Sequence, residues 1–197
     1  MKIEIRADNT ALITGYVNVV ARESRVLRDV NGNFVELVEA GVFNRALEKA
    51  TSVGLMFNHN RLLGSTADNS VELYEDNIGL YARAVVSDEE IIKKAKNNEL
   101  VGWSFSFYLN EDEWSQRSDG MRLRTLKDID LVEVSMLDIT PAYIATSIEM
   151  RDGQNTLKEY RNAVETVELV DNSVTAPPAE SDVDMSMLRR KFDFLII

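Results

Sequence analysis

The stretch NELVGWSFSFYLNEDEW (98–114) places two serines inside an apolar run with the alternating pattern of a buried β-strand. Successive side chains of a strand point to opposite faces. One face carries the aromatic residues Trp103, Phe105 and Phe107. Ser104 and Ser106 lie on the other face, where a buried hydroxyl needs a hydrogen bond or a chemical role. The aromatic face therefore predicts a core. The serine face predicts a polar surface or the lining of a cleft, unless both serines simply face solvent.

Most of the chain around this stretch has the same two-residue period, which is typical of β-strands. Strands are expected at 11–20, 32–38, 53–59, 70–76, 79–86 and 120–137. Turn residues at 31–33 and 75–79 predict two hairpins.

Three segments have the amphipathic pattern of helices. The first covers 41–50. Ser87 and Glu90 form a capping box that predicts a second helix, ending near residue 98. Thr156 and Glu159 form another capping box, which predicts a third helix. We therefore expect a mainly β fold of the α+β class, a small antiparallel β barrel with peripheral helices.

The composition changes after the folded body, which we expect to span residues 1–170 as one domain. Residues 171–184 are polar and acidic and contain two of the three prolines, so they predict a flexible linker. Residues 185–197 are apolar again. This last segment is either a tail that docks the protein to a partner or a terminus that folds back on the body.

Charge and composition exclude several classes of function. The chain has no cysteine, which removes thiol nucleophiles and thiolate metal sites. Its formal net charge of -11 argues against binding nucleic acid. No segment has the pattern of a signal peptide or a membrane helix, so we expect no membrane partner. A single histidine also excludes zinc sites that need two, and we expect no metal and no cofactor.

That single histidine, His59, follows the expected strand at 53–59, where a loop begins. Loops at strand ends often carry functional groups, although a lone histidine is more often a residue without a role. Glu133 lies in the apolar segment 131–137 and needs a partner if it is buried. It could orient an imidazole, or it could pair with a nearby cation: Arg122, Arg124 or Lys127. Asp130 and Asp138 are weaker candidates for the same role.

Five blocks in order resemble the prohead proteases of tailed phages, whose barrel is similar to herpesvirus assemblin. The blocks are GVFNRAL (41–47), LMFNHN with LLGST (55–66), DNIGLYARAVV (76–86), GWSFSFYL with EDEW (102–114) and VEVSMLDITPAYIATSIEMR (132–151). The resemblance runs from about residue 11 to residue 151. It implies that His59, Ser104 and Glu133 are the catalytic residues. Ser106 stands where many relatives have a second glycine, and the match favours Ser104 as the nucleophile.

The resemblance also implies a mechanism and a place. His59 would take the proton of Ser104 during attack on a peptide carbonyl, and Glu133 would orient the imidazole. The substrate would be the major capsid protein, its delta region or a scaffold, cleaved inside the procapsid in the host cytoplasm, together with the protease itself. A homo-oligomer, a dimer as in assemblin, is also implied. The alternative is a non-catalytic capsid assembly or scaffolding module with the same barrel.

Overall fold

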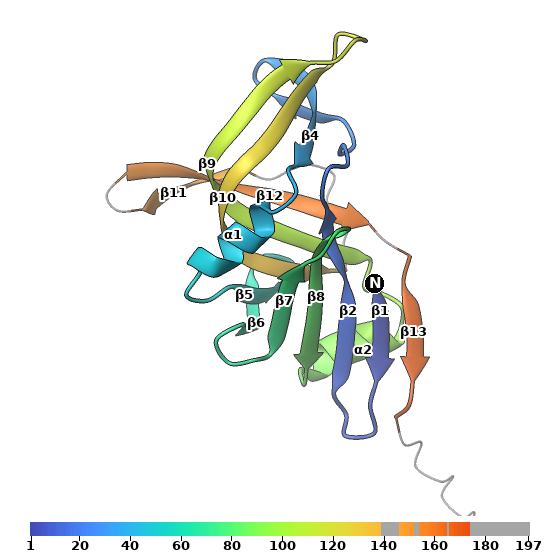
Figure 1. The fold of residues 1–197 in the computed structure, drawn as a ribbon. Helices are drawn as coiled ribbons and strands as arrows, with labels where there is room; N and C mark the ends of the chain where they lie inside the picture. The colour runs from blue at the N-terminus through green and yellow to red at the C-terminus, as the bar shows by residue number, and fades with distance from the viewer. Residues whose placement is uncertain (139–145, 152–153, 165, 174–197) are drawn as a thin grey trace, which may run out of the picture.

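The computed structural model describes residues 1–138, 146–151, 154–164 and 166–173. These residues form two helices, α1 (Val42–Lys49) and α2 (Glu89–Lys96), and thirteen strands. The strands are β1 (Lys2–Ile5), β2 (Ala11–Val19), β3 (Leu27–Asp29), β4 (Gly32–Val38), β5 (Gly54–Phe57), β6 (Arg61–Ser65), β7 (Val71–Glu75), β8 (Gly79–Val86), β9 (Gly102–Gln116), β10 (Arg122–Leu137), β11 (Thr146–Arg151), β12 (Gln154–Val164) and β13 (Glu168–Asp171). The expectation of a mainly β fold with few helices is confirmed (Figure 1).

The strands form two sheets. The smaller has the order β13-β1-β2-β8-β7, and the larger has the order β11-β12-β9-β10-β4-β3, with β5 and β6 attached at the inner end of β10. Within the described residues the two ladders do not join into a closed barrel. Most of the strand pairs are antiparallel, as the sequence predicted, and three are parallel: β1 with β13, and β10 with β4 and with β5.

One hydrophobic core lies between the two sheets and takes side chains from both. Trp103, Phe105 and Phe107 of β9 are fully buried in it, as the alternation of their strand predicted. The Phe105 ring meets Phe43 of α1 edge to face, with 5.4 Å between centroids. Each such ring contributes about 1.5–3 kcal/mol by its burial. The core thus fixes which face of β9 points inward, and Ser104 must point to the other side of the larger sheet.

Helix α1 lies where the sequence predicted it, and α2 differs in its cap. Asp88, not Ser87, is the N-cap of α2, because its carboxylate accepts the backbone N–H groups of Glu90 and Ile91. An acidic side chain at this position also interacts favourably with the positive end of the helix. No helix in the described part of the chain has the length and apolar character needed to cross a bilayer.

The helix predicted from Thr156 and Glu159 is wrong. That segment is strand β12, which pairs with β9 in antiparallel register. Glu159 and Arg161 lie two residues apart and are both buried on the core side of the sheet, where a strand places them together. A capping box is a local signal, and here the tertiary pairing of the strand overrides it.

Glu159 and Arg161 belong to a buried ion-pair network with Glu36 and Arg124. Arg161 donates to both Glu36 oxygens, at 2.6 and 2.8 Å, and to Glu159 at 2.6 Å. Arg124 donates to Glu159 at 2.8 and 2.9 Å and to Asp112 at 2.6 Å. The network ties together β4, β9, β10 and β12, and its members satisfy one another in a place where an unpaired charge would be costly.

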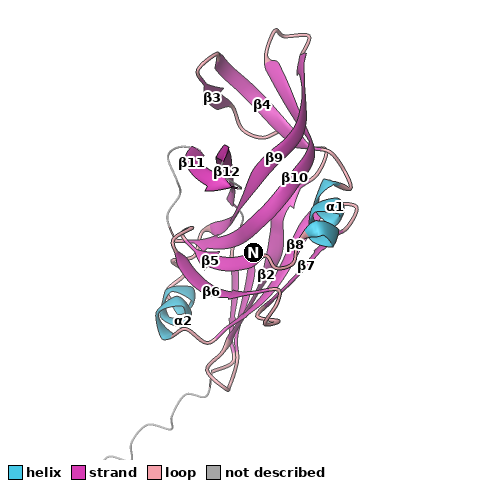
Figure 2. Cartoon of the chain, turned by 90° about the vertical axis from the view of Figure 1, so that its left-hand side faces the viewer, coloured by secondary structure: helices cyan, strands magenta, loops and turns pink. Residues whose placement is uncertain are grey.

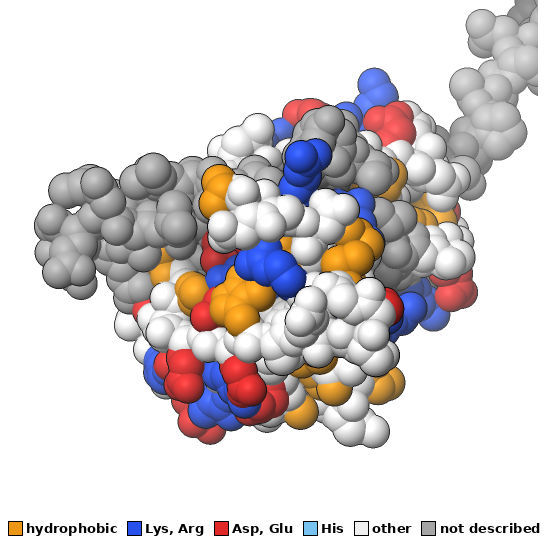
Figure 3. All heavy atoms as spheres, turned by 90° about the horizontal axis from the view of Figure 1, so that it is seen from above, with side chains coloured by type: hydrophobic (Ala, Val, Ile, Leu, Met, Phe, Trp, Pro, Cys, Tyr) orange, Lys and Arg blue, Asp and Glu red, His pale blue; other side chains and the backbone are white. Residues whose placement is uncertain are grey.

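Beyond this network, the outer parts of β9 and β10 extend from the body together with β3 and β4 (Figures 1 and 2). We call this extension the arm. Arg122 packs over the Trp114 ring, 4.2 Å from its centroid, and also pairs with Asp29. Viewed along the arm, basic, acidic and apolar side chains are closely mixed on that face (Figure 3). The predicted linker and tail lie outside the described residues, except for the first residues of the linker, up to 173.

Candidate active site

His59 lies at the tip of the hairpin that joins β5 to β6. Asn58 and His59 have positive φ angles of 48° and 61°, and the N–H of Asn60 donates to the carbonyl of Phe57 at 3.2 Å. Two consecutive left-handed residues closed by this bond are typical of a type I′ hairpin turn. Asparagine adopts this conformation readily, but histidine does so at a cost of about 1–2 kcal/mol. Such strain persists where surrounding contacts enforce it, and it clusters at functional sites.

Glu133 contacts the imidazole of His59. It lies on β10, which pairs in parallel with β5 and so leads towards the same end of the sheet. The distance between Nδ1 of His59 and Oε1 of Glu133 is 2.6 Å, and Glu133 is only 4% exposed. When the Glu133 carboxylate is ionised it can only accept a hydrogen bond, and Nδ1 then carries the proton in this contact. The neutral imidazole then has its lone pair on Nε2, as a general base requires.

The alternative in which Glu133 pairs with a nearby cation is wrong. Arg122 pairs with Asp29, Arg124 belongs to the buried network, and Lys127 pairs with Glu39 and Glu113. Oε2 of Glu133 has no hydrogen-bond partner among the described residues.

The two rival acids have other hydrogen-bond partners. Asp138 accepts from the side chain of Asn58, and Asp130 accepts from Asn110.

Ser104 and Ser106 lie on the strand next to Glu133. In the antiparallel register of β9 with β10, Ser106 is opposite Glu133 and Ser104 is opposite Ser135. Directly opposed residues of an antiparallel pair have Cβ atoms about 4.5–5.5 Å apart. Both serines are 0% exposed, so the interpretation that they face solvent is wrong. The structure therefore brings Glu133, His59 and both serines to one face of the larger sheet.

The hydroxyls of the two serines differ in their partners. Ser104 Oγ donates to the carbonyl of Arg161 on β12 at 2.6 Å. Ser106 Oγ has no hydrogen-bond partner among the described residues. The Ser104 hydroxyl would have to rotate from this carbonyl towards His59 in order to react, and catalytic hydrogen bonds often form only with substrate bound.

Ser135 binds the backbone of His59. It was not among the candidate site residues identified from the sequence. Its Oγ accepts the His59 N–H at 3.0 Å, and the side chain is fully buried. The signal was present, because Ser135 follows Glu133 by two residues and so shares its face of β10. The contact depends on the parallel register of β5 with β10, which no local pattern indicates.

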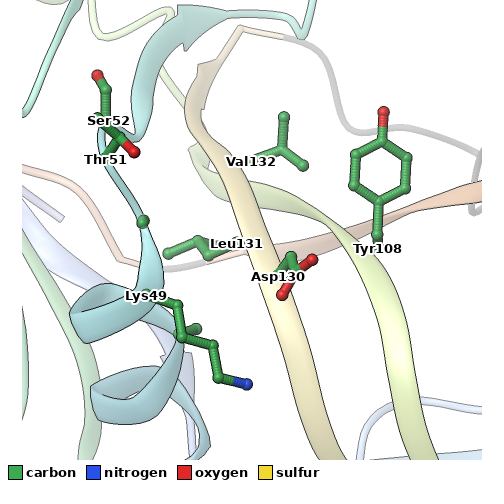
Figure 4. Close-up of a pocket in the computed structure, with 9 residues that line it drawn as sticks. Lys49, Thr51, Ser52, Tyr108, Asp130, Leu131 and Val132 are labelled. Carbon is green, nitrogen blue, oxygen red and sulfur yellow. The ribbon is translucent and has the colours of Figure 1, made fainter. Parts of the chain in front are cut away.

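A cavity of about 380 Å³ lies beside this site. Its walls come from the end of α1 and the following loop, with Thr51 and Ser52, and from the middle of β9 and β10, with Tyr108, Asp130 and Val132 (Figure 4). Tyr108 and Asp130 are opposed in register, and the pair of Phe107 and Leu131 and a bulge lie between them and the pair of Ser106 and Glu133. None of His59, Ser104 and Glu133 lines the cavity.

The described side chains offer no group of three acids or histidines that could hold a metal ion. What the site offers is an imidazole oriented by a carboxylate, with hydroxyls on the adjacent strand. This combination is suited to nucleophilic attack on an acyl group.

A family model described as Caudovirus prohead serine protease matches residues 1–159. No curated protein and no solved structure matches the chain.

Proposed function

The chain belongs to the Caudovirus prohead serine protease family and is a serine protease, and from this premise we propose that it cleaves capsid or scaffold protein with Ser104, His59 and Glu133 as its catalytic residues. The observation that carries the proposal is the contact of 2.6 Å between the sole histidine and a buried carboxylate on the face that also holds Ser104. Proteases of this family act in the prohead, which places the reaction inside the assembling procapsid.

In the proposed mechanism, Ser104 attacks the carbonyl carbon of the scissile peptide while His59 takes its proton. Glu133 keeps the proton of the imidazole on Nδ1 and stabilises the imidazolium that forms. His59 then gives the proton to the leaving amine, and water, deprotonated by His59, releases the acyl group from Ser104. We also propose that the cavity lined by Tyr108 and Val132 binds a side chain of the substrate.

The identity of the nucleophile is the step that most needs a test, because Ser106 shares the same face. We choose Ser104 because its GWSF block (102–105) resembles the block that carries the nucleophile in this family. The arrangement of the hydroxyls does not decide between them, since Ser104 donates to Arg161.

The test is coexpression with the major capsid protein of the same phage, followed by gel analysis of the capsid protein. Ser104→Ala and His59→Ala should each lower the cleavage rate by about 10⁴ to 10⁶. Ser106→Ala should cleave at close to the rate of the unaltered protein. A serine-directed phosphonate, followed by mass spectrometry of the labelled peptide, should mark Ser104. Normal cleavage by Ser104→Ala would refute the assignment.

Three further parts of the proposal concern partners. We propose that the protease acts as a homo-oligomer, that residues 185–197 dock it to the shell, and that cleavage within 172–184 releases it. Intact-mass measurement of the protease during maturation tests the last part, and an unshortened chain throughout would contradict it.

A further inference from the structure

The turn that carries His59 is tethered to the end of β10 through the preceding residue. The Asn58 side-chain amide donates from Nδ2 to Oδ1 of Asp138 at 2.7 Å. In return, the backbone N–H of Asp138 donates to Oδ1 of Asn58 at 3.2 Å. The backbone N–H of Asn58 donates to the carbonyl of Met136 at 2.9 Å. Three hydrogen bonds thus fix a residue that is adjacent in sequence to the proposed base.

Asp138 is itself held from the other side by helix α2. Its Oδ2 lies 2.8 Å from Nζ of Lys94, and both side chains are partly buried. The same ammonium lies 5.9 Å from the centroid of the Phe57 ring, at the end of β5. Figure 2 shows α2 beside the β5–β6 hairpin. Burial alone would raise the pKa of Asp138, but the Lys94 ammonium and the Asn58 amide lower it by more than burial raises it. The pKa therefore lies below its ordinary value, and the carboxyl is ionised at neutral pH.

Helix α2 also contacts the far side of the turn. Arg61, the first residue of β6, pairs with Asp88 and, at 2.6 Å, with Glu90 in the first turn of α2. These side chains are more exposed, so their contribution is small. The helix nevertheless contacts the hairpin both before and after His59.

The conformation of the turn makes such support necessary. Asn58 and His59 both have positive φ, and for histidine this conformation is less stable than ordinary backbone. Its imidazole must also stay at hydrogen-bonding distance from Glu133, and a misplacement of about 1 Å can cost about 10²-fold in rate.

We propose that Asp138 is a positioning residue, which with Lys94 clamps Asn58 and thereby aims the imidazole of His59 at Glu133. The proposal rests on the proposed function in that His59 is taken as the general base. Asp138 does not touch the reacting atoms. It acts through Asn58 and the shape of the turn, so its loss should affect the geometry of the imidazole and kcat rather than substrate binding.

The first experiment compares Asp138→Ala and Asp138→Asn with the unaltered protein on a peptide containing the capsid cleavage site. We expect Asp138→Ala to lower kcat by about 10- to 100-fold with little change in KM. The kcat of Asp138→Asn should lie between that of Asp138→Ala and that of the unaltered protein. Asparagine keeps an acceptor for Asn58 but loses the charge that binds Lys94.

The second readout uses the fact that the chain has one histidine. The Nδ1 proton of His59 should give a single downfield NMR resonance, because it is hydrogen-bonded to a carboxylate. We expect this resonance to weaken or shift in the folded Asp138→Ala protein. If Asp138 only stabilised the fold, kcat would fall with the folded fraction and the resonance of the folded molecules would be unchanged. That result would overturn the proposal.

Asn58→Gly tests the side-chain hydrogen bonds of Asn58 separately from the backbone conformation of the turn. Glycine adopts positive φ without strain, so this variant keeps the turn and loses only the side-chain bonds to Asp138. A loss of kcat similar to that of Asp138→Ala supports the clamp, and unaltered kcat with an unaltered resonance refutes it. The matched control is Asp29→Ala, which breaks the ion pair with Arg122 in the arm and should leave kcat and the resonance unchanged.

The NMR readout also distinguishes failure of the clamp from failure of the proposed function. If His59→Ala still cleaved, the catalytic assignment would be wrong. The clamp would still be supported if the resonance depended on Asp138, and it would be overturned if the resonance did not.

Discussion

Nδ1 of His59 lies 2.6 Å from Oε1 of Glu133, although the two residues are 74 positions apart in the chain. The contact exists because β5 and β10 run parallel, so that the turn after β5 folds back beside the end of β10. Ser104 and Ser106 reach the same face from the opposite side of β10. Strand β10 thus lies between the two sources of the candidate site. The imidazole comes from the turn after β5, and the two serine hydroxyls come from β9.

The first prediction concerns the carboxylate. Glu133→Gln keeps the shape of the side chain but removes its charge and allows the wrong imidazole tautomer. We expect kcat for capsid cleavage to fall by about 10³- to 10⁴-fold, by analogy with loss of the acid in other serine proteases. Single-turnover cleavage of a capsid peptide measures this. The melting temperature should not fall, since a buried charge is replaced by a neutral group. A variant that cleaves normally would show that Glu133 is only structural.

The second prediction separates the two serines by stability rather than activity. Ser106 Oγ is buried and has no hydrogen-bond partner among the described residues, so Ser106→Ala should leave the free energy of unfolding unchanged or raise it by about 1 kcal/mol. Ser104→Ala removes the bond to the Arg161 carbonyl and should lower the free energy by about 1 kcal/mol. Urea unfolding of both variants measures the difference. Equal effects would mean that the two hydroxyls have equivalent surroundings.

The sequence predicted the strand that carries the serines because its signal is local. The alternation of aromatic and serine residues decides which face of the strand packs into the hydrophobic core. The sole histidine can be identified from the composition alone. The helix predicted at Thr156 failed for a related reason. Its capping box is also a local signal, but Glu159 is used in an ion pair with Arg124, which is distant in the chain.

The tether between Asn58 and Asp138 had no signal in the sequence. It depends on the parallel register of β5 with β10 and on the position of α2 behind the hairpin. The identity of the N-cap of α2 was also missed, since Ser87 and Asp88 are both good capping residues and only the backbone geometry chooses between them.

The third prediction concerns the buried ion-pair network. Glu36→Gln removes one of the two carboxylates that Arg161 and Arg124 share, so that only Glu159 remains between them. Removing one partner of a buried ion pair costs up to about 3–5 kcal/mol, because the guanidinium groups stay buried with less opposing charge. Chemical denaturation of the variant measures the loss. Glu72→Gln, which breaks the exposed pair with Arg83, is the control and should change stability by less than about 0.5 kcal/mol. A small loss for Glu36→Gln would mean that the network relaxes around the missing charge.

The last prediction concerns acid stability and follows from Glu159. Burial alone would raise its pKa, but its hydrogen bond to Arg124 and the charges of Arg161 and Arg124 lower it below the ordinary value of 4.5. The unfolded chain therefore binds the proton first as the pH falls. The contribution of Glu159 to stability is complete above that ordinary value and is lost as the pH falls through the lower, folded value.

We therefore expect the free energy of unfolding to be nearly constant near neutral pH and to fall in the acid range, by at most about 1.4 kcal/mol per pH unit for each such carboxyl. Urea titrations between about pH 7 and about pH 3 measure this slope. Glu159→Gln should be less stable at neutral pH and should have a shallower acid slope, because it removes one of the protons taken up on unfolding. Asp8→Asn is the comparison, since the pKa of this exposed carboxyl is lowered mainly by its local hydrogen bonds to Thr10. An acid slope that is the same in Glu159→Gln and in the unaltered protein would show that the Glu159 pKa is the same in the folded and unfolded chains.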